Sequence, residues 1–398
     1  MKINKLIPYR PVLNIIPVLV FLTAGCHRPG AEDFKSEIDS IAVQWAPDIR
    51  EAIFEAKLIT VGPDMILQGE TDIPQAKEAL TGLLKNKGIT FLDSLKVLPD
   101  TTIIKEAWGL VNVSVCNIRA ASSYGSELVT QALIGTPVRI LKKDGGWFLI
   151  QTPDLYLGWV DNDVIELMNL NEYKAWKSSL RIFYTRKTGD IMAELSYEKV
   201  ISDIVAGGIV KLTGDQKGFF EVCLPDGRKG FINKNEGVLL DELSTGTYLT
   251  PGNLVSTAES FMGIPYLWGG TSAKGFDCSG FVKTVYFLNG IILSRDASQQ
   301  FRNGIRIRRS SYPDSCKAGD LLFFGSTRYG RPRATHVGMY LGNSEFIHAA
   351  GMVKVNSLDT TRHNFSRYRR DTFLGVRRII GAESGTGIQL VSDHKWYH

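Results

Sequence analysis

The stretch Phe276-Asp277-Cys278-Ser279-Gly280-Phe281-Val282 predicts the start of a buried helix with a cysteine in its first turn. Asp277 stands at the N-cap position, where a carboxylate can accept a bond from a free backbone N–H group. One face of the helix is apolar and is formed by Phe281, Val282, Val285, Tyr286 and Leu288. The unpaired N–H groups and the positive end of the helix dipole favour a thiolate, so we expect Cys278 to be nucleophilic near neutral pH.

Two histidines further along the chain could serve this thiol. His336 opens one strand-like run, His348 lies in the next, and Gly342-Asn343-Ser344 between them is typical of a hairpin turn. If the loop has an odd number of residues and no bulge intervenes, both histidines share one face, roughly 5 to 8 Å apart at Cβ. One imidazole could then act as base while the other orients it, as in a catalytic triad. A lone cysteine is often only a small buried side chain, but two histidines on one hairpin favour catalysis.

Five motifs in this part of the chain resemble those of the NlpC-type cysteine peptidases of the bacterial cell wall. In order they are Tyr266-Leu267-Trp268-Gly269-Gly270, Phe276-Asp277-Cys278-Ser279-Gly280-Phe281, Ala318-Gly319-Asp320-Leu321-Leu322-Phe323-Phe324, His336-Val337-Gly338-Met339-Tyr340-Leu341 and Phe346-Ile347-His348-Ala349. The resemblance covers residues 250 to about 382. It implies an α+β fold with a papain-like cysteine peptidase domain over 250–384. The remaining residues, 385–398, are expected to form a loose tail.

An internal repeat precedes the peptidase part. A shift of 72 residues aligns, without a gap, Gly135-Thr136-Pro137-Val138-Arg139-Ile140 with Gly207-Gly208-Ile209-Val210-Lys211-Leu212, and Gly146-Trp147-Phe148-Leu149-Ile150 with Gly218-Phe219-Phe220-Glu221-Val222. Short strands with glycine-rich turns predict two small β-barrels, over 105–168 and 169–245, which resemble bacterial SH3-like modules. Before them, residues 27–104 predict a mixed helical and α/β scaffold with a helix from Ile73 to Lys87.

Residues 1–26 are typical of a bacterial lipoprotein signal peptide. Three basic residues precede the apolar run from Val12 to Leu22, which is too short to span a bilayer. The run ends in Leu22-Thr23-Ala24-Gly25-Cys26, which resembles a lipobox. We therefore expect an exported protein, in the periplasm or at the cell envelope, that touches the membrane only through a lipid on Cys26.

The charge of the 398-residue chain is +5 and is unevenly distributed. Residues 250–398 contain 19 Lys and Arg against 10 Asp and Glu, while the other residues contain 27 against 31. A basic peptidase part suits an anionic substrate such as a cell-wall stem peptide, which carries several carboxylates. The five cysteines show no metal-ligand spacing, so neither a metal nor a cofactor is expected, and no nucleic-acid motif is found.

The resemblance implies a catalytic set and an acyl-side pocket. Cys278 would be the nucleophile, His336 the base and His348 its orienting partner, with the Tyr266 hydroxyl near the oxyanion. The acyl side of the substrate would be shaped by Trp268, Asp277, Ser279 and Ser298. Asp277 could combine this role with helix capping.

In two-barrel relatives the first barrel closes the site, and an acid and a tyrosine bind the free amine of the substrate. Their positions in the first repeat make Glu127 and Tyr156 the candidates here. A solvated glutamate and a tyrosine at the rim are the structural alternatives.

Together these resemblances imply a monomeric peptidase that cuts the bond between γ-D-glutamate and a diamino acid in peptidoglycan stem peptides. The diamino acid would be meso-diaminopimelate or L-lysine, and the N-terminal L-alanine would be free, as in murein recycling. A barrel over the amine leaves no room for a sugar-linked stem, and a buried carboxylate without its ammonium is unfavourable. The alternatives are an endopeptidase or acyltransferase that acts on intact peptidoglycan, and a non-catalytic wall-binding lipoprotein.

Overall fold

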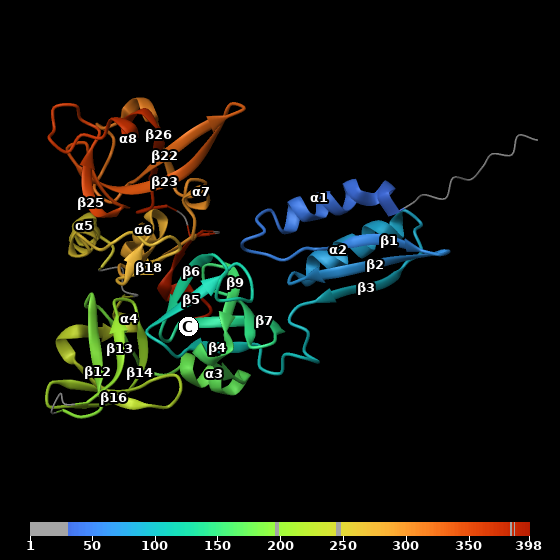
Figure 1. Ribbon diagram of the computed structural model, residues 1–398, viewed down its shortest axis with the longest axis horizontal. Coiled ribbons are helices and arrows are strands. Elements are labelled where there is room, and N and C mark those ends of the chain that lie inside the picture. Colours follow the sequence, from blue (N-terminus) through green and yellow to red (C-terminus); the bar gives the residue numbers. More distant parts are fainter. Residues whose placement is uncertain (1–30, 196–198, 244–247, 383, 386) are drawn as a thin grey trace, which may run out of the picture.

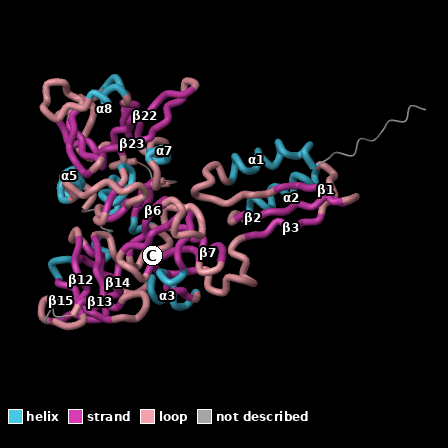
Figure 2. Tube along the Cα trace, viewed as in Figure 1, coloured by secondary structure: helices cyan, strands magenta, loops and turns pink. Residues whose placement is uncertain are grey.

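The computed structural model describes residues 31–195, 199–243, 248–382, 384–385 and 387–398. The expected signal peptide and Cys26 lie outside the described residues. Figure 1 shows an N-terminal unit to one side, two β-barrels, and a peptidase part above them. Strands predominate, and the helices are few and short (Figure 2). No helix of the described residues is long and apolar enough to cross a membrane.

The N-terminal unit is a three-stranded sheet covered by two helices. Its elements are η1 (Ala31–Phe34), α1 (Lys35–Trp45), β1 (Lys57–Val61), β2 (Asp64–Thr71), α2 (Pro74–Asn86) and β3 (Leu92–Val97). Strands β1 and β2 are antiparallel, whereas β2 and β3 are parallel and are joined through α2. Proline at the first position of α2 suits a helix start, since its missing N–H group would have no helical partner there. The predicted helix from Ile73 to Lys87 is thus confirmed to within one residue at each end.

Two barrels with one strand order follow. The first contains β4 (Trp108–Val111), β5 (Val115–Arg119), β6 (Leu128–Leu133), β7 (Pro137–Asp144), β8 (Trp147–Gln151), β9 (Leu157–Asp161), η2 (Asn162–Val164) and β10 (Ile165–Met168), and α3 (Leu170–Lys177) follows it. The second contains β11 (Arg181–Tyr184), β12 (Thr188–Met192), β13 (Val200–Val205), β14 (Ile209–Gln216), β15 (Phe219–Cys223), β16 (Lys229–Asn233), η3 (Lys234–Glu236) and β17 (Gly237–Leu239). The orders β10-β4-β7-β8-β9-β5-β6 and β17-β11-β14-β15-β16-β12-β13 correspond strand by strand. Strand β7 begins at Pro137 and β14 at Ile209, which is the 72-residue shift seen in the sequence.

The peptidase part packs helices on a six-stranded antiparallel sheet. Helix α4 (Leu240–Leu243) still packs on the second barrel, against β11 and β17. The elements of the peptidase part are α5 (Pro251–Ser260), β18 (Thr271–Ser272), β19 (Gly275–Phe276), α6 (Cys278–Phe287), β20 (Ile291–Leu293), α7 (Ala297–Gln300), β21 (Ile305–Ile307), η4 (Arg309–Ser311), β22 (Leu321–Arg328), β23 (Arg331–Gly342), β24 (Glu345–Ala350), β25 (Met352–Ser357), α8 (Arg367–Asp371) and β26 (Phe373–Arg378). The sheet order is β21-β26-β22-β23-β24-β25. Helix α6 is buried against this sheet in the largest apolar cluster, which fixes the position of its first turn.

The C-terminal residues do not form the loose tail that we expected. Strand β27 (Ile388–Leu390) pairs with β20, and η5 (Val391–Asp393) follows it. Trp396 and Tyr397 are buried, and their carbonyl oxygens accept hydrogen bonds from Tyr173 Oη at 2.7 Å and Arg181 Nη1 at 2.6 Å. No periodic pattern in the sequence indicates this burial, because it comes from contacts with distant parts of the chain. The C-terminus therefore ties the peptidase part to both barrels (Figure 1).

Candidate active site

Cys278 lies at the first position of α6, as the sequence predicts. The Asp277 carboxylate caps the helix by accepting a hydrogen bond of 2.7 Å from the Gly280 backbone N–H. A Cβ atom on Gly280 would lie 2.0 Å from the Gly270 carbonyl oxygen, so glycine lets the preceding loop pass close to the helix start. The cap and this close approach hold the sulfur at a fixed point, where Cys278 is 7% exposed.

The pKa of the Cys278 thiol differs from our expectation. Burial raises it to about 11, and the charge of Asp277 adds to the increase, while the Val337 backbone N–H and Arg295 oppose it. The predicted lowering by the helix N-terminus is therefore wrong for the free protein, because loss of water around the sulfur penalises the thiolate more than the local dipoles stabilise it. The free protein carries a protonated thiol at neutral pH, which needs a base.

The two histidines lie on neighbouring strands of one hairpin, His336 on β23 and His348 on β24. The loop contains only two residues, Asn343 and Ser344, both with positive φ, as a type I′ turn requires. Neither condition set for a shared face holds, since the loop is even-numbered and Leu341 bulges out of the ladder, but the bulge restores the parity. The histidines consequently share a face, with ring centroids 4.9 Å apart.

A chain of hydrogen bonds fixes which ring nitrogens carry protons. Asn356 Nδ2 donates to the Asn364 carbonyl oxygen at 3.0 Å, which leaves Asn356 Oδ1 to accept from His348 Nε2 at 2.9 Å. His348 Nδ1 is then an acceptor, and it lies 2.7 Å from His336 Nε2, which must donate. A neutral His336 therefore has its lone pair on Nδ1, the nitrogen available to a thiol.

Both imidazoles are neutral at physiological pH. Burial lowers the pKa of His348 to about 4, and burial together with the charges of Arg369 and His348 lowers the pKa of His336 well below its ordinary value. A buried imidazole loses the water that would stabilise its cation. The free site thus consists of a thiol and an uncharged base.

A cavity of about 410 Å³ opens beside Cys278. The predicted site residues that line it are Glu127, Tyr156, Tyr266, Trp268, Asp277, Cys278, Ser279, Ser298 and His336. His348 is 1% exposed and is hydrogen-bonded to Nε2 of His336, as expected of a residue that orients the base. The structure therefore brings together residues of the first barrel and of the peptidase part, such as Glu127 and Trp268, which are 141 positions apart.

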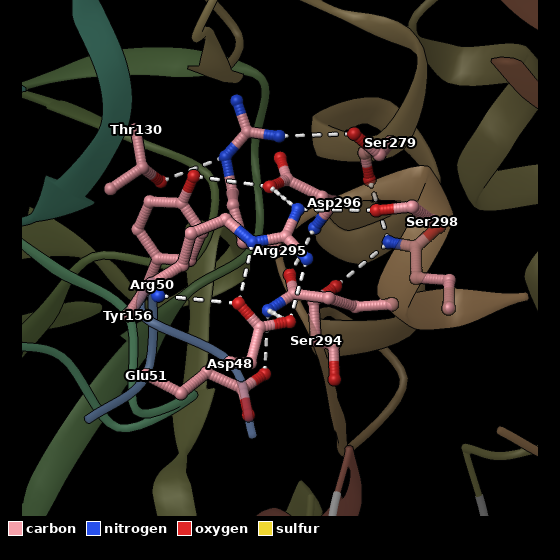
Figure 3. A network of polar contacts seen from close by, with 12 residues as sticks. Asp48, Arg50, Glu51, Thr130, Tyr156, Ser279, Ser294, Arg295, Asp296 and Ser298 are labelled. Carbon is pink, nitrogen blue, oxygen red and sulfur yellow. Dashed lines mark hydrogen bonds and ion pairs between the residues drawn. The ribbon is translucent and has the colours of Figure 1, made fainter. Parts of the chain in front are cut away.

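The first barrel contributes Glu127 and Tyr156 to the cavity wall. Glu127 Oε1 accepts a hydrogen bond of 2.7 Å from Trp268 Nε1 of the peptidase part. Tyr156 Oη donates to Asp296 Oδ2 at 3.1 Å (Figure 3). Among the described residues Glu127 forms no ion pair, so its charge is available to a cationic group in the cavity.

Asp277 and Ser279 are enclosed by protein. The Asp277 carboxylate pairs with the buried Arg295 and accepts from the Gly269 N–H at 3.1 Å. Ser279 Oγ lies 3.2 Å from Asp277 Oδ1 and accepts from Arg295 Nη1 at 3.1 Å. Arg295 also donates to Thr130 Oγ1 of the first barrel at 2.9 Å, which joins the two parts. Asp277 therefore caps α6 and holds Arg295 in place. Its direct contact with a substrate stays a prediction.

Sequence reasoning missed four residues of the site. Arg50 and Arg295 were missed because each joins the peptidase part to another part of the chain, Arg50 through Asp296 and Arg295 through Thr130. Asp296 is the N-cap residue of the short helix α7, and Asn356 occupies an ordinary strand position. The alternation along β25 could have placed Asn356 on the face of His348, but its partner across the sheet could not be known. No group of three His, Cys, Asp or Glu side chains in the described part of the chain is placed to hold a metal ion.

A thiol at a helix start, an uncharged imidazole from an antiparallel sheet and a second buried imidazole behind it define a papain-like cysteine peptidase. Family comparison agrees with this class. Residues 263–378 match the NlpC/P60 family, and residues 118–165 match the bacterial dipeptidyl-peptidase Sh3 domain. The chain belongs to the NlpC/P60 family, and its α+β fold joins a papain-like domain to SH3-like barrels, as the sequence predicts.

Curated relatives cover most of the chain. A gamma-D-glutamyl-L-lysine dipeptidyl-peptidase of Bacillus cereus is 28% identical over 301 residues, which cover 72% of this chain and 86% of the relative. Dipeptidyl-peptidase 6 of Lysinibacillus sphaericus is 30% identical, with 68% of this chain and 97% of the relative covered. A crystal structure of an NlpC/P60 family protein from Bacillus cereus superposes with a TM-score of 0.59 at 24% identity, over 68% of this chain and 99% of that chain.

Proposed function

We propose that the protein hydrolyses the γ-D-glutamyl–diamino acid bond of peptidoglycan stem peptides that have a free N-terminal L-alanine. The observation that carries this proposal is the position of Glu127. This carboxylate, held by Trp268, has no ion-pair partner in the described structure and lines the same cavity as Cys278. An ammonium group at Glu127 would place a short peptide across the sulfur. The names of the relatives support this substrate class.

The proposed chemistry is acyl transfer from the peptide to water. His336 Nδ1 takes the proton of Cys278, and the thiolate attacks the γ-amide carbonyl carbon. His336 then gives this proton to the amine that leaves, and a water molecule hydrolyses the thioester, regenerating the thiol. His348 keeps His336 in the tautomer with a basic Nδ1.

Tyr266 and the Cys278 backbone N–H would stabilise the tetrahedral oxyanion. Burial, with the charges of Cys278 and Asp277, raises the pKa of Tyr266 to about 12. The phenol therefore keeps its proton at neutral pH and can donate it to a developing negative charge.

The first barrel explains the proposed preference for short free peptides. Gln131 of this barrel bonds to Thr271 N–H at 3.0 Å, and a Cβ on Gly269 would lie 2.3 Å from the Leu128 carbonyl oxygen. In the proposed binding mode the rim of this barrel, which carries Glu127, covers the amine end of the substrate. A sugar-linked stem would have no ammonium for Glu127 and would have to displace the rim.

The test is a digest of defined substrates followed by mass spectrometry. The substrates are L-Ala-γ-D-Glu-L-Lys, the corresponding meso-diaminopimelate peptide, their N-acetylated forms, and intact sacculi. We expect release of L-Ala-γ-D-Glu from the free peptides and little from the acetylated ones. Efficient release from sacculi, with no preference for a free amine, would instead support an endopeptidase that acts on intact peptidoglycan.

We further propose that the protein is exported and held at the membrane by lipid on Cys26, and that it acts as a monomer. The support is the lipobox-like ending of the apolar run and the cell-wall activity named for relatives. Labelling with a radioactive fatty acid should mark the full chain but not its Cys26→Ala variant. Equal labelling of the two would contradict the anchor, and a dimer in light scattering would contradict the monomer.

A further inference from the structure

A turn of the N-terminal unit enters the wall of the catalytic cavity. Arg50, which follows α1 by a few residues, lines the same cavity as Cys278. Its backbone carbonyl accepts from the Leu157 N–H of the first barrel at 2.8 Å, and Gln151 Nε2 donates to the Glu51 carbonyl oxygen at 2.7 Å. The turn is therefore fixed to the barrel on one side and faces the peptidase part on the other (Figure 3).

The Arg50 guanidinium is held between two carboxylates. Asp48 accepts from Arg50 Nε at 2.7 Å and from Nη2 at 2.6 Å, and Asp296 Oδ2 accepts from Nη1 at 2.6 Å. Arg302 of the peptidase part also donates to Asp48, at 2.7 Å. The guanidinium is planar, and hydrogen bonds along two of its edges hold it in one orientation. A lysine ammonium could not form the same set of bonds.

This orientation sets the hydrogen-bond direction of two predicted pocket residues. Arg50 Nη1 also lies 3.1 Å from Ser298 Oγ, and a guanidinium has only donors, so the Ser298 oxygen accepts. The hydroxyl hydrogen of Ser298 is then left to donate to an acceptor in the cavity. Tyr156 donates to the same Asp296 oxygen that Arg50 holds, so the phenol oxygen is left to accept. The pocket thus presents a donor at Ser298 and an acceptor at Tyr156.

We propose that Arg50 is a positioning residue of the substrate pocket and that the N-terminal unit is for this reason a part of the active site. This proposal rests on the proposed function. Arg50 holds Asp296 in place, which aims the Tyr156 oxygen at the ammonium of the N-terminal L-alanine. It also turns the Ser298 hydroxyl toward an acceptor oxygen of the glutamyl group. The substrate class that this polarity fits is a zwitterionic peptide with a free amine and a carboxylate close to each other.

The experiment measures kcat and KM of the full chain for L-Ala-γ-D-Glu-L-Lys. Arg50→Ala should raise KM about tenfold or more, as expected when a charge-assisted contact is lost, with the loss falling on KM more than on kcat. Arg50→Lys keeps the charge but cannot bridge Asp48, Asp296 and Ser298 together, so it should restore only part of the affinity. The preference for the free over the N-acetylated peptide should be highest in the wild type, lower in Arg50→Lys and lowest in Arg50→Ala.

Two control variants separate positioning from docking of the N-terminal unit. Lys142→Ala and Glu70→Gln each remove, from opposite sides, the ion pair between the first barrel and the N-terminal unit, and both residues lie outside the cavity wall. Both should keep the wild-type KM. An unchanged or lower KM in Arg50→Ala, or an equal rise in the controls, would overturn the proposal. If the wild type cleaves no stem peptide, the proposed function itself fails, and the role of Arg50 fails with it.

Discussion

His336 Nε2 lies 2.7 Å from His348 Nδ1, and this contact is one link in a series that ends at a backbone carbonyl. Asn356 fixes the tautomer of His348, because the Asn356 amide NH₂ donates to the Asn364 carbonyl and the Asn356 side-chain oxygen therefore accepts from His348 Nε2. A proton position next to the sulfur is therefore set by a residue two strands away in the sheet, on β25.

Replacing Asn356 tests this series. Asn356→Leu has a similar size but no acceptor, so His348 can adopt the other tautomer and present an N–H to His336. We expect kcat to fall about tenfold to hundredfold, within the range that general base catalysis contributes. Asn356→Asp keeps an acceptor and should retain most of the activity. A wild-type kcat in Asn356→Leu would show that the tautomer is fixed in another way.

The reactivity of the thiol should depend on pH in a particular direction. The pKa of Cys278 is raised to about 11, so the thiolate fraction of the free protein is small at pH 7 and grows toward pH 11. Alkylation of Cys278 by iodoacetamide, followed by mass spectrometry, should accelerate throughout this interval. A fast rate with a plateau between pH 5 and 8 would reveal a preformed thiolate–imidazolium pair, contrary to this expectation. Cys278→Ser provides the background rate for the other cysteines.

Glu127 should act on substrate affinity. Glu127→Gln keeps the oxygen that accepts from Trp268 Nε1 but removes the charge. We expect KM for the free peptide to rise about tenfold to hundredfold, since a partly desolvated ion pair is lost, with a smaller change in kcat. The N-acetylated peptide should be processed at the same low rate by both proteins. A KM that does not change would place the ammonium elsewhere.

The buried ion pair of Arg295 with Asp277 should matter for stability. Arg295→Met leaves the Asp277 carboxylate without its cation, which should destabilise the protein by about 3–5 kcal/mol. Denaturant unfolding of the full chain measures this change. The double variant Arg295→Met/Asp277→Asn removes both charges and should recover part of the loss. The ion pair of Arg378 with Asp320 lies in the same domain but away from the cavity. The change in the free energy of unfolding when Arg378 is replaced by Met is the comparison for the change in Arg295→Met.

The C-terminal residues should contribute to stability as core residues do. Tyr397 is 2% exposed and packs among residues of both barrels and α6. Tyr397→Ala should destabilise the protein by about 3–5 kcal/mol, the usual range for a buried aromatic side chain. Leu390→Ala, at a half-exposed position of the same segment, should have a small effect. Equal thermal unfolding of Tyr397→Ala and wild type would mean that the tail is not held in solution.

Local patterns were enough to predict the core of the site. The helix cap at Asp277, the apolar face behind Cys278 and the 72-residue repeat all depend on residues close together in sequence. The sequence offered a shared face of the two histidines only for an odd-numbered loop without a bulge, whereas in the structure a bulge compensates for a two-residue loop. The pKa of Cys278 was predicted in the wrong direction, because burial depends on the whole fold and the dipole argument does not include it.

The features that escaped prediction join parts of the chain that are far apart. Arg50 meets Asp296 across 246 positions, and Tyr173 meets Trp396 across 223. No periodicity or motif encodes such pairs, and a single sequence offers no signal for them. They are nevertheless the contacts that fix how the N-terminal unit, the barrels and the peptidase part sit against one another.

The burial of Trp396 and Tyr397 has a consequence for how a new chain matures. These residues follow both barrels in the chain, so each barrel can fold during translation, whereas the seam between barrels and peptidase can close only once the segment with Trp396 and Tyr397 has left the ribosome. The joint between the catalytic domain and its barrels is thereby assembled later than the barrels themselves.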